Sequence, residues 1–103
     1  MQGMDGKYEA LGKKIGSLVD EKNTAYGDSF NRVAEILAVL YPQGVRVEQY
    51  RDTLAVVRVL DKLFRVANDK HAFGESPWKD IAGYGLLGAM ADERERRGDE
   101  AAH

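Results

Sequence analysis

The segment EQYRDTLAVVRVLDKLFRVAN, residues 48–68, decides the fold class of this chain. When its residues are placed at 100° steps, apolar side chains cover one wide face of a helix. The pattern therefore predicts a central helix. Because one neighbouring helix is too narrow to cover this face, it also predicts a homo-oligomer. The face comprises Val56, Val57, Leu60, Leu63, Phe64 and Ala67, extended by Val59 and Val66.

The remaining wedge of this helix is polar and carries Arg58, Asp61, Lys62 and Arg65. Charged groups close to a core are costly unless they are paired and hydrogen-bonded. We expect Arg65 to pair with Asp61, one turn away, or with Asp80 on the following helix. The wedge is consistent both with a structural ion-pair network and with a ligand site.

Helical spacing also dominates the rest of the chain, so an all-α fold is expected. We predict further helices at about residues 5–24 and 30–41, the second capped by Ser29, and one that starts at Pro77 after Ser76. The expected architecture is a compact bundle of about four helices. It forms a single domain over residues 1–91, followed by a charged tail over 92–103 that frays. The first helix carries an apolar stripe of Tyr8, Leu11, Ile15, Leu18 and Val19.

Composition narrows the classes of function. The 103 residues include no cysteine, which excludes disulfides, thiolate zinc sites and a cysteine nucleophile. The net charge of −2 comes from 15 basic and 17 acidic residues, so we do not expect nucleic-acid binding. No apolar run is long enough to span a membrane, and no secretory signal is visible. A cytoplasmic protein without a membrane partner is the expectation.

Polar side chains that interrupt the apolar faces of the predicted helices mark a candidate site. In EKNTAYGDSF, residues 21–30, Lys22 continues the apolar stripe of the first helix, and Asn23 and Tyr26 flank it. Cationic groups can hold a phosphate while an aromatic ring stacks on a base. A small nucleotide-like ligand therefore fits this combination. The candidate ligand-binding residues are Lys22, Asn23, Tyr26, Asp61, Lys62, Arg65, Asp80 and Tyr84.

No metal site or other cofactor is assigned from the sequence. Neither a clustered glutamate array nor a glycine-rich phosphate loop is present. If the protein uses Mg²⁺, the expected oxygen ligands are Asp61, Glu75 and Asp80, which Glu21 or Asp28 could join.

Three segments together suggest a family. EKNTAYGDSF, RVLDKLFRVAN and SPWKDIAGYGLL resemble small helical, mostly phage-encoded proteins with K-N-x-x-Y-G, D-K-x-x-R and D-x-x-G-Y motifs. These are described as nucleotide-modification-associated domains or MazG-like nucleotide pyrophosphohydrolases. The resemblance spans about residues 15–91 and implies a helical fold, a connection with nucleotides and, for a phage protein, the cytoplasm of an infected host cell. The matching positions are Lys22, Asn23, Tyr26, Gly27, Asp61, Lys62, Arg65, Asp80, Gly83 and Tyr84.

The chain departs from MazG-type enzymes in lacking their paired-glutamate metal array, which weighs against hydrolysis more than against binding. Three hypotheses follow. The protein binds a nucleotide or nucleotide-derived signal, as a sequestering or nucleotide-metabolism factor. Alternatively, it is a Mg²⁺-dependent nucleotide pyrophosphohydrolase, or a structural and interaction module whose polar wedge is only an ion-pair network.

Overall fold

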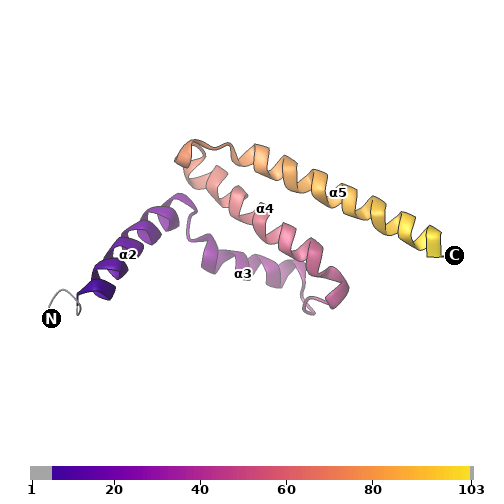
Figure 1. Ribbon diagram of the computed structural model, residues 1–103, viewed down its shortest axis with the longest axis horizontal. Helices are drawn as coiled ribbons and strands as arrows, with labels where there is room; N and C mark the ends of the chain where they lie inside the picture. Colours follow the sequence, from indigo (N-terminus) through magenta and orange to yellow (C-terminus); the bar gives the residue numbers. More distant parts are fainter. Residues whose placement is uncertain (1–5, 103) are drawn as a thin grey trace.

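A computed structural model describes the backbone of residues 6–102 and the side chains of residues 6–98. Within that range the chain is helical and contains no strand, which confirms the all-α prediction. Four α-helices follow one another, with a short 3₁₀ turn on either side of α4 (Figure 1). The elements are α2 (Lys7–Ala25), α3 (Ser29–Leu40), η1 (Val47–Gln49), α4 (Tyr50–Asp69), η2 (Ala72–Gly74) and α5 (Pro77–Ala102).

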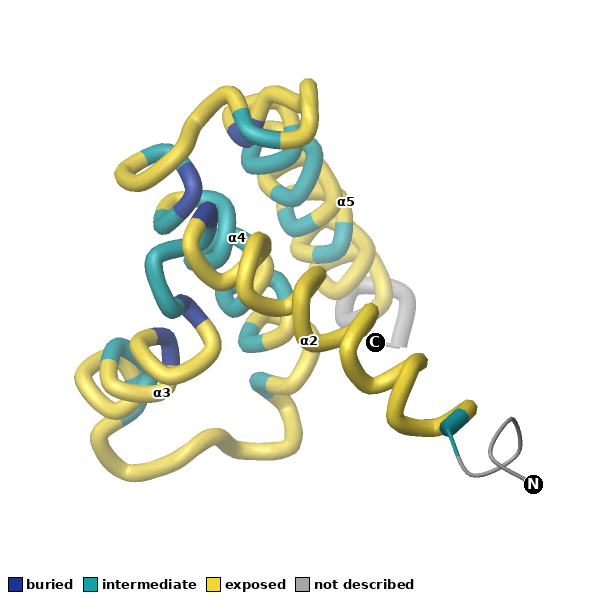
Figure 2. Tube along the Cα trace, turned by 90° about the vertical axis from the view of Figure 1, so that its left-hand side faces the viewer, coloured by how far each residue is buried: buried dark blue, intermediate teal, exposed yellow. Residues whose placement is uncertain are grey.

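Helix α4 is the centre of the arrangement. It contacts α5, α3, α2 and η1, as its wide apolar face predicts. Helix α5 turns back after η2 and runs alongside α4 (Figure 1). The C-terminal end of α2 lies against α4, and the N-terminal part of α2 projects away from the α4–α5 pair (Figures 1 and 2). The connection after α2 therefore lies close to the middle of the molecule.

Two consecutive left-handed residues turn the chain between α2 and α3. Gly27 has φ of 61° and Asp28 has φ of 59°. A Cβ at the first position would also overlap the side-chain amide of Asn68, so a larger residue there requires Asn68 to move. The predicted cap is wrong by one residue: Asp28 is the N-cap, and Ser29 is the first helical residue and is buried.

The apolar stripe of α2 is left largely uncovered by the rest of the described chain. Tyr8 is 74% exposed, and the other four stripe residues are 49–55% exposed. The wide face of α4 is largely half-buried, and Leu63 and Ala67 are exposed. Figure 2 shows how little of the chain is buried. Among the described side chains, the buried apolar residues are Ala25, Val33 and Pro77.

Helix α5 begins at Pro77, as predicted, and continues to Ala102. It therefore runs on through residues 92–102, which the sequence assigns to a separate tail. None of the described helices is both long and apolar enough to cross a membrane.

Candidate functional site

A cavity of about 450 Å³ opens where α2, α3, α4 and α5 meet, and we call it the central pocket. Its volume falls in the range of small-molecule sites, roughly 300–1,000 Å³. The end of α2 and the α2–α3 connection supply one wall, and the polar wedge of α4 supplies the other. The lining residues are Val19, Lys22, Asn23, Tyr26, Ser29, Arg58, Asp61, Lys62 and Tyr84.

Six of the eight predicted ligand-binding residues line this one pocket. They come from α2, α4, α5 and the α2–α3 connection, and from positions up to 62 residues apart in the sequence, Lys22 to Tyr84. The six are Lys22, Asn23, Tyr26, Asp61, Lys62 and Tyr84. The remaining two, Arg65 and Asp80, are not among the lining residues, although Asp80 touches one of them.

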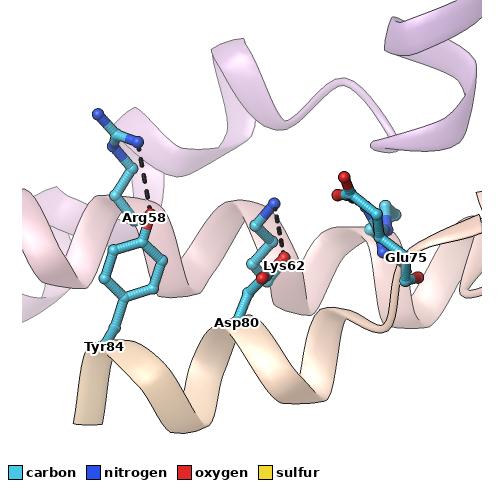
Figure 3. Close-up of polar contacts among 6 residues, drawn as sticks. Arg58, Lys62, Glu75, Asp80 and Tyr84 are labelled. Carbon is cyan, nitrogen blue, oxygen red and sulfur yellow. Dashed lines mark hydrogen bonds and ion pairs between the residues drawn. The ribbon is translucent and has the colours of Figure 1, made fainter. Parts of the chain in front are cut away.

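Two contacts join the pocket wall of α4 to α5 (Figure 3). The ammonium of Lys62 lies 3.1 Å from a carboxylate oxygen of Asp80, and the two side chains are 18% and 37% exposed. One turn away, an Nη of Arg58 donates to the hydroxyl of Tyr84 at 3.4 Å. These contacts fix the orientation of two cationic side chains at the rim of the pocket.

Arg65 has a different partner from the one predicted. Its guanidinium is buried and donates through Nη2 to the main-chain carbonyl of Glu75, while Nη1 lies 3.9 Å from the Glu75 carboxylate. The expected pairing with Asp61 or Asp80 is therefore wrong. The cause is the loop after α4, which folds Glu75 back over the end of the helix. The Nε of Arg65 has no hydrogen-bond partner among the described residues.

The charge of the pocket wall is predominantly positive. Lys22, Arg58 and Lys62 contribute three cations, and Asp61 contributes one carboxylate. Lys22 forms no ion pair within 4 Å of another described residue and lies in line with the apolar stripe of α2. An unpaired cation that lines the same pocket as Arg58 and Lys62 favours an anionic ligand.

Aromatic rings flank these cations. Tyr26 stacks on Phe73 with ring centroids 6.4 Å apart and an angle of 22° between the planes. Tyr84 enters from α5 and is held by Arg58. Both tyrosines line the pocket. A planar ligand could therefore lie against a ring while its anionic part reaches Lys22.

The three carboxylates expected to hold Mg²⁺ do not converge. Glu75 faces Arg65, Asp80 faces Lys62, and Asp61 alone lines the central pocket. Over the described residues, no group of three Asp, Glu, His or Cys side chains is placed to hold a metal ion. The conditional ligand set of Asp61, Glu75 and Asp80 is therefore not assembled. Glu75 lies in the loop between η2 and α5, where helix periodicity gives no position, so the sequence could not show which cation each carboxylate would meet.

Three lining residues were missing from the predicted set: Val19, Ser29 and Arg58. The polar wedge of α4 already contained Arg58, so its helical position was a usable signal. Ser29 was interpreted as a helix cap, and Val19 as part of an apolar stripe. Their place in the pocket follows from the angle between α2 and α4, which no local pattern encodes.

Comparison with protein-family models, with curated proteins and with solved structures finds no match to this chain.

Proposed function

We propose that the central pocket binds a small phosphorylated molecule of the nucleotide class. The observation that carries the proposal is the convergence of Lys22, Arg58 and Lys62 with Tyr26 and Tyr84 around one cavity. Three helices and a turn supply these groups, so the fold gathers them from distant parts of the sequence. The resemblance to nucleotide-associated phage proteins supports the same ligand class.

The residue types suit the two parts of a nucleotide. Ammonium and guanidinium groups donate charge-assisted hydrogen bonds to phosphate oxygens, and each such bond is stronger than a neutral one. Aromatic faces accept a base by stacking, with little dependence on which base it is. Val19 adds an apolar surface at the α2 side of the pocket. Binding in this form requires no bond to be made or broken.

The first test is a thermal-shift screen with mono-, di-, tri- and cyclic nucleotides and inorganic pyrophosphate, each with and without Mg²⁺. A ligand at 100 times its Kd stabilises the folded state by about 2.7 kcal/mol. A positive ligand is then titrated calorimetrically into Lys22→Ala. We expect affinity to fall by about 10- to 100-fold, because one charge-assisted contact is lost.

Lys13→Ala is the matched control, since Lys13 is an exposed lysine on the same helix and does not line the pocket. Equal affinity of the parent and Lys22→Ala for every ligand would contradict the proposed site. The structural-module alternative predicts that no compound in the screen shifts the melting temperature.

The position of Asp61 supports a second candidate, a Mg²⁺-dependent nucleotide hydrolase. It is the one carboxylate in the pocket lining, and Mg²⁺ bound to nucleotide phosphates often uses only one or two protein carboxylates. Asp61→Asn separates the two functions. In a binding protein, removal of the negative charge strengthens nucleotide binding. In a Mg²⁺-dependent hydrolase, it abolishes turnover and the effect of Mg²⁺ on affinity.

A further inference from the structure

The face of α2 that runs into the central pocket has no partner among the other described residues of its own chain. Its apolar side chains are half-exposed or more, from Tyr8 at 74% to Leu18 at 49%. No neighbouring atom lies within 4 Å of the place where a Cβ would stand on Gly12 or Gly16, which border this face. We define the α2 stripe as Tyr8, Leu11, Ile15, Leu18 and Val19.

The amount of exposed surface points to a protein partner of considerable size. The chain exposes 8322 Å². A compact monomer of 11.5 kDa exposes about 5,800 Å². The excess of about 2,500 Å² is counted over the whole chain, of which the α2 face is one part, and it is comparable with the roughly 1,000–2,500 Å² that each subunit of an obligate homodimer buries.

Charges beside the α2 stripe indicate that a second copy of the same helix fits there. Lys14 and Glu21 flank the same edge of the stripe, 60° and 80° from Leu11 at 100° per residue. In an antiparallel pair of α2 helices, Lys14 of each chain lies toward Glu21 of the other. The helix carries both signs of charge along its length, unlike the Lys- and Arg-rich polar face of a membrane-surface helix.

We propose that the protein is a dimer in which two α2 stripes pack antiparallel about a two-fold axis near Ser17 and Leu18. Apolar side chains fill the contact, and Gly16 of each helix leaves room for Val19 of its partner. In this register Leu11 of one chain lies beside Lys22 of the other. Because Lys22 and Val19 line the central pocket, the second copy closes its α2 side.

The proposed closure of the central pocket by the second copy rests on the proposed ligand site, whereas the proposed dimer does not. If the pocket binds a phosphorylated ligand, pocket occupancy and dimer formation stabilise each other, since linkage is reciprocal. Dimerisation is therefore tested without any ligand, so that its failure and the failure of the ligand site give different results.

Introduced cysteines provide a direct test, because the chain has none of its own. Leu18→Cys places a thiol at the two-fold axis and should give a disulfide-linked dimer on mild oxidation. Tyr8→Cys, on the same stripe and more exposed, should not, because the two copies of residue 8 lie at opposite ends of the contact. A Cα separation above about 7 Å prevents the bond.

The register is tested with Leu11→Cys combined with Lys22→Cys. Eleven residues of helix, about 16 Å, keep these two thiols apart within a chain, so any disulfide must join two chains. Charge reversal tests the predicted pairing of Lys14 with Glu21 of the other chain. Lys14→Glu and Glu21→Lys should each raise the dissociation constant of the dimer on the order of tenfold, and the double variant should restore it. Sedimentation of each variant gives the dissociation constants, with Val39→Asp, an exposed site on α3, as the control.

A dimer with efficient Leu18→Cys cross-linking, little Tyr8→Cys cross-linking and rescue by the double charge reversal supports the proposal. Equal cross-linking at both single positions indicates parallel helices and overturns the register. A monomer at all concentrations overturns the dimer itself. A dimer that survives Ile15→Asp but is lost in Val39→Asp places the interface on another surface and also overturns the proposal.

Discussion

At the scale of single residues, the turn between α2 and α3 depends most strongly on Gly27. Two independent constraints meet there: its φ of 61°, and the Asn68 amide in the space that a Cβ would occupy. Gly44 shares the positive φ, at 90°, but has open space around it. The difference between the two positions therefore isolates the cost of the steric overlap from the cost of the backbone conformation.

We predict that Gly27→Ala destabilises the fold by about 2–4 kcal/mol and Gly44→Ala by about 1–2 kcal/mol. Urea denaturation followed by circular dichroism measures both. Trimming the amide in Asn68→Ala should recover part of the loss at Gly27 and none at Gly44. Equal losses at the two glycines would mean that Asn68 moves aside freely.

Arg65 gives a second prediction at this scale. Its guanidinium is buried and donates to the main-chain carbonyl of Glu75, whereas the Glu75 side chain is 67% exposed and its carboxylate lies 3.9 Å away. Arg65→Ala should therefore cost about 2–3 kcal/mol, because it removes a hydrogen bond from a charged donor and the packed methylenes of a buried side chain. Glu75→Gln should change stability by less than about 0.5 kcal/mol. Thermal melts distinguish this result from a true ion-pair dependence, in which both variants would lose stability.

At the scale of elements, an ion pair between α4 and α5 engages Lys62, one of the cations that line the central pocket. Lys62 points to Asp80 across the two helices at 3.1 Å. Asp80→Asn should lower stability by about 1 kcal/mol, because a half-buried ion pair is lost. It should also raise the affinity for pyrophosphate or a nucleotide about threefold or more, since Lys62 becomes available to the anion.

The opposite signs of these two effects make the variant informative. A structural ion pair without a ligand site predicts only the loss of stability. Asp92→Asn, a change of the same type at an exposed position of α5 outside the pocket, is the control and should alter neither quantity. Calorimetry and thermal melting on the same samples decide between the two explanations.

The elements themselves were largely predictable. Periodicity placed the central helix at residues 48–68, and the structure has α4 at Tyr50–Asp69 after the 3₁₀ turn η1. Helical position and the motif resemblance together predicted eight ligand-binding residues, and six of them line the central pocket. The partner of Arg65 was not predictable, since it comes from a loop whose path depends on η2. Nor does an amphipathic pattern reveal which chain will cover an apolar face, so the exposure of the α2 stripe became visible only in three dimensions.

At the scale of the whole molecule, the chain is extended for its length. Its radius of gyration is 19.0 Å and its longest dimension is 68 Å. A compact chain of this length has a radius of about 13 Å. The described helices cover one another so sparsely that the apolar burial within one chain supplies little of the free energy of folding. Stability should therefore depend on association, and the folded state should form together with the dimer.

The last prediction follows from that coupling. If two unfolded chains become one folded dimer, the melting temperature rises with protein concentration by mass action. For a dimer of this size, the expected rise is roughly 5–10 °C over a hundredfold range of concentration. Circular dichroism in cells of different path length measures it. Ile15→Asp, in the middle of the α2 stripe, should leave the chain largely unfolded and without a cooperative transition, whereas Val39→Asp should preserve both the transition and its concentration dependence. A melting temperature that is constant across the range would show that a single chain folds by itself, with the α2 stripe exposed to solvent.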